Sequence, residues 1–87
     1  MSINEESMLS FPCDLPIKVF GRNDDVFRSA ALAIVRARYG DAPRVSEQVS
    51  RQGSYLSLTI TVRAESRAEI DAVYHALVAS EHVLMVL

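Results

Sequence analysis

The stretch that decides the fold is residues 55–64, which read Tyr55-Leu56-Ser57-Leu58-Thr59-Ile60-Thr61-Val62-Arg63-Ala64. Apolar side chains alternate with other, mostly polar, side chains along its whole length, and many of its residues are β-branched. This period of two is typical of a β-strand that has one face in a hydrophobic core and the other face outside it. The side chains predicted to face inward are Leu56, Leu58, Ile60, Val62 and Ala64.

The residues on either side of this strand predict its neighbours in the chain. Upstream, residues 51–54 read Arg-Gln-Gly-Ser, which is typical of a hairpin turn, and residues 45–51 alternate as a polar edge strand. Downstream, residues 66–69 predict a capping box in which Ser66 reaches forward and Glu69 reaches back. A helix is then expected to about Ser80, with the apolar stripe Ile70, Val73, Tyr74, Leu77 and Val78.

The first half of the chain repeats this order of elements. Residues 15–20 alternate as a strand that is expected to end at Gly21. Asn23 or Asp24 suits the N-cap of a helix that runs to about Tyr39, and Gly40 suits a left-handed C-cap. The predicted core stripe of this helix is Val26, Phe27, Ala30, Ala31, Ile34 and Ala37, with Leu32 on the opposite side.

The resulting order, β-α-β-β-α-β, predicts an α+β fold of the ferredoxin-like class. Right-handed crossovers give an antiparallel sheet in the spatial order 4-1-3-2, with both helices on one face. Residues 1–13 are expected to form a polar leader and residues 14–87 a single domain. Residues 83–87 are expected to form an edge strand, with Leu84 and Val86 on the open face and Val83, Met85 and Leu87 facing the core.

Composition excludes several classes of protein. A chain of 87 residues with 49% hydrophobic and 23% charged residues is typical of one soluble globular domain. The single cysteine, Cys13, cannot form an intramolecular disulfide, which favours a reducing compartment. No stretch reaches the roughly 18 apolar residues that a bilayer span needs. We therefore expect a cytoplasmic protein that makes no membrane contact.

Charge argues against a nucleic-acid partner. Nine basic and eleven acidic residues give a net charge of -2, whereas proteins that wrap a duplex usually carry a basic excess. RNA-recognition domains share this order of elements, and Arg51, Gly53 and Tyr55 are faintly similar to their base-stacking motif. The second aromatic of that motif is missing, because position 57 is Ser. We therefore expect no nucleic-acid partner.

Few residues offer catalytic or metal chemistry. Nothing in the pattern places Cys13 near His75 or His82, and two histidines without a third ligand make a weak metal site. Asp24 and Asp25 suit the positive end of the first helix better than an active site. We therefore expect no catalytic residue, no metal and no cofactor, and the chain is not expected to be an enzyme.

Several short motifs taken together resemble the YbeD family of small uncharacterised bacterial proteins. They are Phe11-Pro12, residues 17–21, residues 53–60 and the run Val-Leu-Met-Val-Leu at residues 83–87. The similarity covers about residues 9–87, although Phe20 stands where the family usually has Met and Leu84 where a basic residue is common. The resemblance implies a ferredoxin-like fold similar to ACT regulatory domains, and no established activity. Members are often encoded near lipoate-attachment genes, which is a contextual hint only.

Two functions from different classes remain open. The first is a non-enzymatic binding or regulatory module that acts through protein contacts of the open sheet face, with Phe20, Tyr55, Leu84 and Val86 as the partner surface. A weak homodimer through the last strand is expected, unless the leader covers this face. The alternative is an ACT-like sensor of an amino acid or related metabolite. The resemblance then makes Gly21, Arg22, Asn23 and Asp24 the candidate ligand residues.

Overall fold

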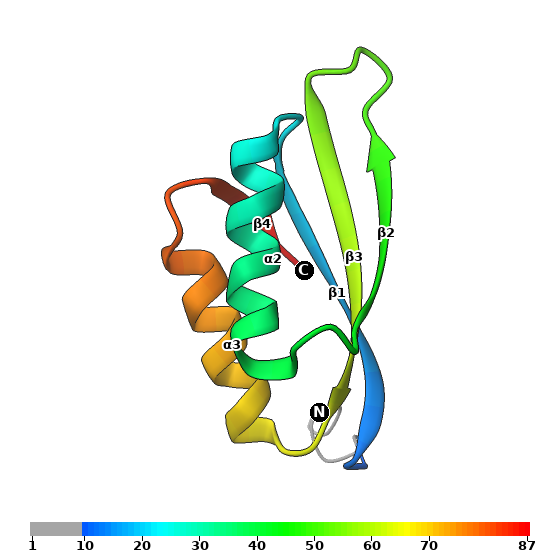
Figure 1. Ribbon diagram of the computed structural model, residues 1–87, viewed down its shortest axis with the longest axis vertical. Coiled ribbons are helices and arrows are strands. Elements are labelled where there is room, and N and C mark those ends of the chain that lie inside the picture. Colours follow the sequence, from blue (N-terminus) through cyan, green and yellow to red (C-terminus); the bar gives the residue numbers. More distant parts are fainter. Residues whose placement is uncertain (1–9) are drawn as a thin grey trace, which may run out of the picture.

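The computed structural model describes residues 10–87, which form six elements in the predicted order (Figure 1). The leader expected at residues 1–13 lies largely outside the described residues. Its last residue, Cys13, already belongs to the first strand, which continues through Gly21 to Arg22. The elements are β1 (Cys13–Arg22), α2 (Asp25–Tyr39), β2 (Arg44–Val49), β3 (Tyr55–Ala64), α3 (Arg67–Ala79) and β4 (Val83–Val86).

The four strands form one antiparallel sheet in the order β2-β3-β1-β4, which confirms the predicted order 4-1-3-2 and the ferredoxin-like class. β1 pairs with β3 over its whole length, from Cys13 opposite Ala64 to Arg22 opposite Tyr55. This continuous pairing is the reason that β1 is longer than its alternation predicted. The β2–β3 hairpin reaches beyond the helices at one end of the molecule (Figure 1).

One hydrophobic core lies between the sheet and the two helices, so both helices cover the same face of the sheet. The inward residues of β3 are buried as predicted, and Ile17 and Val19 of β1 lie beside them. The helices bury one residue per turn against these strands. Their buried residues are Phe27, Ala31 and Val35 of α2 and Ile70, Val73 and Leu77 of α3.

The predicted helix faces are partly wrong at their margins. On α2, Val26 is exposed and Val35 is buried, while Leu32 packs against the edge of the core instead of facing away from it. On α3, Val78 is exposed. A helix that lies on a sheet buries a narrow line of residues, and periodicity alone does not decide which of two adjacent apolar residues lies on that line.

The N-cap and C-cap of α2 are as predicted. The Asp24 Oδ1 accepts a hydrogen bond of 2.8 Å from the backbone N–H of Phe27. Gly40 ends the helix with φ of 64°, a conformation that favours glycine, and its N–H donates to the carbonyl of Arg36.

The capping box of α3 is only half confirmed. Ser66 Oγ accepts from the N–H of Glu69 at 3.2 Å. The Glu69 carboxylate, however, accepts from the N–H of Glu65 and from the hydroxyl of Tyr39, so it ties α3 to the end of α2. Burial and this hydrogen bond raise the pKa of Tyr39, which keeps its hydroxyl protonated as a donor.

A β-bulge reverses the predicted alternation of β4. Val86 lies opposite Val19 and Met85 opposite Phe20, but the next pair is Val83 with Gly21, so the register shifts by one residue. Val83 and Val86 therefore both pack against the core. The expectation that Val86 faces the open side and Met85 the core is wrong, because one extra residue in a strand exchanges its two faces.

Candidate functional site

The face of the sheet opposite the helices is the surface that offers the most chemistry. Within residues 10–87, no helix or further strand covers it. The pairing register places its side chains in rows that cross the strands. In one row, Phe20 lies between Ser57 of β3 and Met85 of β4. In the next row, Lys18 exchanges two backbone hydrogen bonds, of 2.8 and 3.2 Å, with Leu87.

An apolar strip, made of Phe20, Leu84, Met85 and Leu87, runs along the β1–β4 side of this face. Phe20 is half-buried, whereas Leu84, Met85 and Leu87 are 60%, 49% and 63% exposed. Of the predicted partner surface, Phe20 and Leu84 lie in the strip, and Val86 lies on the core side of the sheet. Sequence reasoning missed Met85 and Leu87, because the bulge that turns Met85 outward leaves no mark in the alternation.

A shallow groove of about 320 Å³ crosses the same face near the β2–β3 hairpin. Two aromatic side chains line it, Phe20 from β1 and Tyr55 from β3, and Tyr55 is 48% exposed. Lys18 and Arg51 bring positive charge to its walls. The groove also has hydrogen-bonding side chains, which come from Gln48, Ser50 and Ser57.

Gly21 and Asn23, two of the predicted ligand residues, make contacts with other parts of the chain that serve the fold. A Cβ at Gly21 would lie 2.2 Å from the ring of Phe27, so the lack of a side chain at Gly21 is what lets this ring enter the core. Asn23 ties the loop to the hairpin: its N–H donates to the carbonyl of Ser54, and its side-chain amide donates to the carbonyl of Gly53, both at 3.0 Å.

The other two predicted ligand residues differ from each other. Asp24 is the N-cap of α2, so its carboxylate already accepts a backbone hydrogen bond. Arg22 is exposed on the open face opposite Tyr55, and its side chain has no ion pair within residues 10–87. Local structure therefore explains Gly21, Asn23 and Asp24, and leaves Arg22 available to a ligand.

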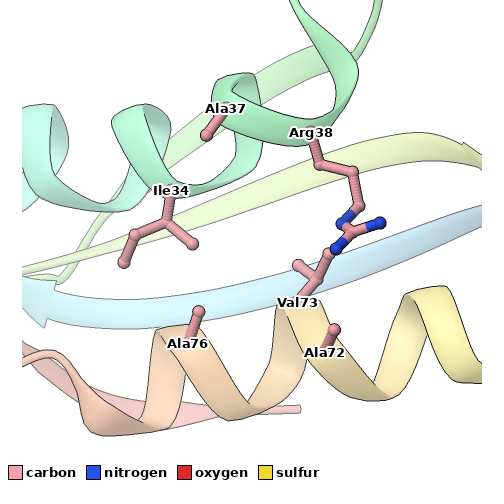
Figure 2. A pocket seen from close by; sticks show the side chains of 6 residues that line it. All are labelled: Ile34, Ala37, Arg38, Ala72, Val73 and Ala76. Carbon is pink, nitrogen blue, oxygen red and sulfur yellow. The ribbon is translucent and has the colours of Figure 1, made fainter.

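A second groove, of about 490 Å³, lies between the two helices (Figure 2). Its walls are mostly small or aliphatic, and Arg38 extends from α2 toward α3 as its charged side chain. It holds no pair of polar side chains that would orient a ligand. The lining residues are Ile34, Ala37, Arg38, Ala72, Val73 and Ala76.

An ion-pair cluster joins α2 to the edge strand β2 on the helix side. The Arg28 guanidinium donates to both carboxylate oxygens of Glu47, at 2.9 and 3.1 Å, and to Asp25 at 2.8 Å. The hydrogen bond from Arg28 holds the pKa of Glu47 below its ordinary value. Both side chains remain partly exposed, so the cluster orients β2 and is not an isolated buried charge.

The candidate catalytic residues lie on different elements. Cys13 opens β1 and packs against the margin of the core, His75 is exposed on α3, and His82 follows α3 beside Glu81. In the part of the chain that the structure describes, no three His, Cys, Asp or Glu side chains gather as a metal site requires. The helices of this part are also too short or too polar to cross a membrane.

These observations define a small ferredoxin-like α+β domain in which the described elements leave one sheet face uncovered. The family described as "Protein of unknown function (DUF493)" matches residues 6–87. The chain therefore belongs to this family of uncharacterised bacterial proteins, and the resemblance to the YbeD family is confirmed.

Relatives extend over the whole chain. A UPF0250 protein of Nitrosomonas europaea is 40% identical and covers 98% of this chain and 100% of its own length. A UPF0250 protein of Paraburkholderia phytofirmans is 42% identical, and the match covers 100% of both chains. The solution structure of protein HP0495 from H. pylori has a TM-score of 0.75 at 12% identity, covering 100% of this chain and 93% of that one, and shows the same fold. None of these three names states an activity.

Proposed function

We propose that this protein is a non-enzymatic binding or regulatory module that acts through protein contacts of its open sheet face. The observation that carries the proposal is the apolar strip. Its three most exposed residues, Leu84, Met85 and Leu87, are close together in the chain, Met85 lies opposite Phe20, and Leu87 is paired with the next outward residue, Lys18. Contiguous apolar side chains on an uncovered face mark interaction sites more often than scattered ones do.

The first partner we propose is a second copy of the chain. β4 is an edge strand, whose outer edge offers unpaired backbone groups, and a two-fold contact would pack the strip of one copy on that of the other. Burial of an exposed apolar side chain contributes about 1.5–3 kcal/mol, while association costs several kcal/mol. The difference is small, so the dimer is expected to depend on concentration.

Sedimentation of the full chain over a range of concentrations tests this contact. Leu84→Lys and Met85→Lys should each shift the protein toward monomer, because both place a charge in the strip. Val78→Lys is the matched control, since it adds the same charge at an exposed valine of α3. Circular dichroism should show the same fold for all three variants. A native chain that stays monomeric at high micromolar concentration would contradict the proposal.

The sensor of an amino acid or related metabolite is the second proposal, and it has less support. Gly21, Asn23 and Asp24 serve the fold, so a ligand would depend mainly on Arg22. A metabolite that binds the native state raises the melting temperature. A screen of amino acids with no such shift, or a shift that Arg22→Ala leaves unchanged, would remove this alternative.

A further inference from the structure

The net charge conceals a division between paired and unpaired cations. Arg28, Arg36, Arg63 and Arg67 each have a carboxylate partner. Apart from Arg63, these paired arginines belong to the two helices. Within residues 10–87, the cations that form no ion pair are Lys18, Arg22, Arg38, Arg44 and Arg51.

All of these unpaired cations except Arg38 belong to the open sheet face, and we call Lys18, Arg22, Arg44 and Arg51 the cationic row. Lys18 and Arg22 are outward residues of β1, Arg44 pairs with the outward Thr61 of β3, and Arg51 lines the groove. Asp14 is the one acidic residue at the outward positions of β1, β2 and β3, and its carboxylate is paired with Arg63. The cationic row is therefore not neutralised by the strands that carry it.

Two aromatic rings lie among these cations. Phe20 and Tyr55 line the groove together with Lys18 and Arg51, and Tyr55 is opposite Arg22. Strand β3 lacks a second outward aromatic because position 57 is Ser, but the register places Phe20 of β1 directly beside Ser57. Two adjacent strands thus supply the aromatic pair that one strand alone does not.

The cationic row extends beyond the groove, because Arg22 and Arg44 do not line it. Arg22 and Lys18 are four residues apart on β1, and Arg44 lies across the sheet from Pro16, two residues beyond Lys18. At about 3.4 Å per residue, the row extends over roughly 20 Å. A single nucleotide would occupy one end of it, whereas the whole row suits several phosphates of one strand.

We infer that this face binds single-stranded nucleic acid, with bases stacked on Phe20 and Tyr55 and phosphates held by the cationic row. Sheets that bind single strands combine stacked aromatics with a positively charged track in this way. An acidic protein partner would pair with the cations but would leave the two aromatic rings without a role. The bases of a duplex are stacked on one another inside the helix, so they could not stack on Phe20 and Tyr55. Net charge argued against nucleic acid, but it does not report the charge of one face.

Fluorescence anisotropy of a labelled oligouridylate of about 12 nucleotides tests the inference with the full chain. Tyr55→Ala should weaken binding about 5- to 150-fold, and Tyr55→Phe should restore it. If all four cations contact phosphates, the affinity should fall with salt with a log–log slope of roughly -3, at about 0.7 per contact. Arg51→Gln and Arg22→Gln should each weaken binding and reduce that slope by about 0.7.

Arg38→Gln is the matched control, since it removes an unpaired cation from the helix side and should change neither affinity nor slope. Unchanged binding by Tyr55→Ala would overturn the inference, and so would a lack of binding at low salt. Equal affinity for polyglutamate, for a duplex of the same length or for uridine monophosphate would also overturn it. Anisotropy measures oligonucleotide binding and sedimentation without oligonucleotide measures self-association, so failure of this inference is distinguishable from failure of the proposed dimer.

Discussion

Single residues of the β1–α2 loop serve the fold more than they serve a ligand. Gly21 makes room for the buried ring of Phe27, Asn23 holds the hairpin, and Asp24 caps the helix. The expected likeness in fold to ACT domains pointed to this loop as a unit, because an analogy of fold does not separate residues that bind from residues that hold the loop. Among these four residues, Arg22 is the one that faces outward on the sheet and whose side chain forms no ion pair within residues 10–87.

Gly21→Ala tests this assignment. The new methyl group would meet three atoms of the Phe27 ring at 2.2–2.5 Å, and that ring lies fully within the core. Overpacking of this kind costs about 1–3 kcal/mol. The free energy of unfolding, measured by urea denaturation, should therefore fall by that amount. Phe27→Leu should relieve part of the clash, and the double variant should then lose less than the sum of the two single losses. Additive losses would mean that the two residues do not press on each other.

The elements differ in how far the sequence could predict them. β3 is correct along its whole length, because its alternation, its hairpin and its inward residues all agree. In the last strand, the position at the sheet edge is correct, but the faces predicted for Met85, Val86 and Leu87 are wrong, because a bulge depends on the strand beside it and local alternation does not contain that information. The sequence placed Phe20 and Tyr55 on the same face of the sheet but not in one groove, because only the register of β1 with β3 brings these two side chains close together.

The bulge in β4 makes a prediction opposite to that of simple alternation. Val86→Lys should destabilise the fold by roughly 1–3 kcal/mol, because Val86 packs against the core. Met85→Lys should leave the free energy of unfolding nearly unchanged, because Met85 lies on the open face. Urea unfolding of the two variants side by side measures both effects. The reverse order of stability would show that β4 alternates without a bulge.

At the scale of the whole molecule, one sheet face carries two chemistries. The apolar strip lies on the β4 side and the cationic row extends toward the hairpin and β2, while the partnered arginines of α2 and α3 lie on the other layer. Such a division lets a chain with a net charge of -2 present a positive face to a partner. The two chemistries meet at Phe20, which belongs both to the strip and to the groove.

This shared residue predicts that self-association and nucleic-acid binding exclude each other. A dimer that packs strip on strip covers Phe20, and a base stacked on Phe20 occupies the same ring. Because coupling between two binding events is reciprocal, an oligonucleotide should lower the apparent association constant of the dimer, and dimerisation should in turn lower the apparent affinity for the oligonucleotide. Sedimentation of the native chain with and without oligouridylate measures the first effect, and anisotropy at rising protein concentration measures the second. A dimer fraction that does not change at saturating oligonucleotide would show that the two surfaces are separate and that Phe20 serves only one of them.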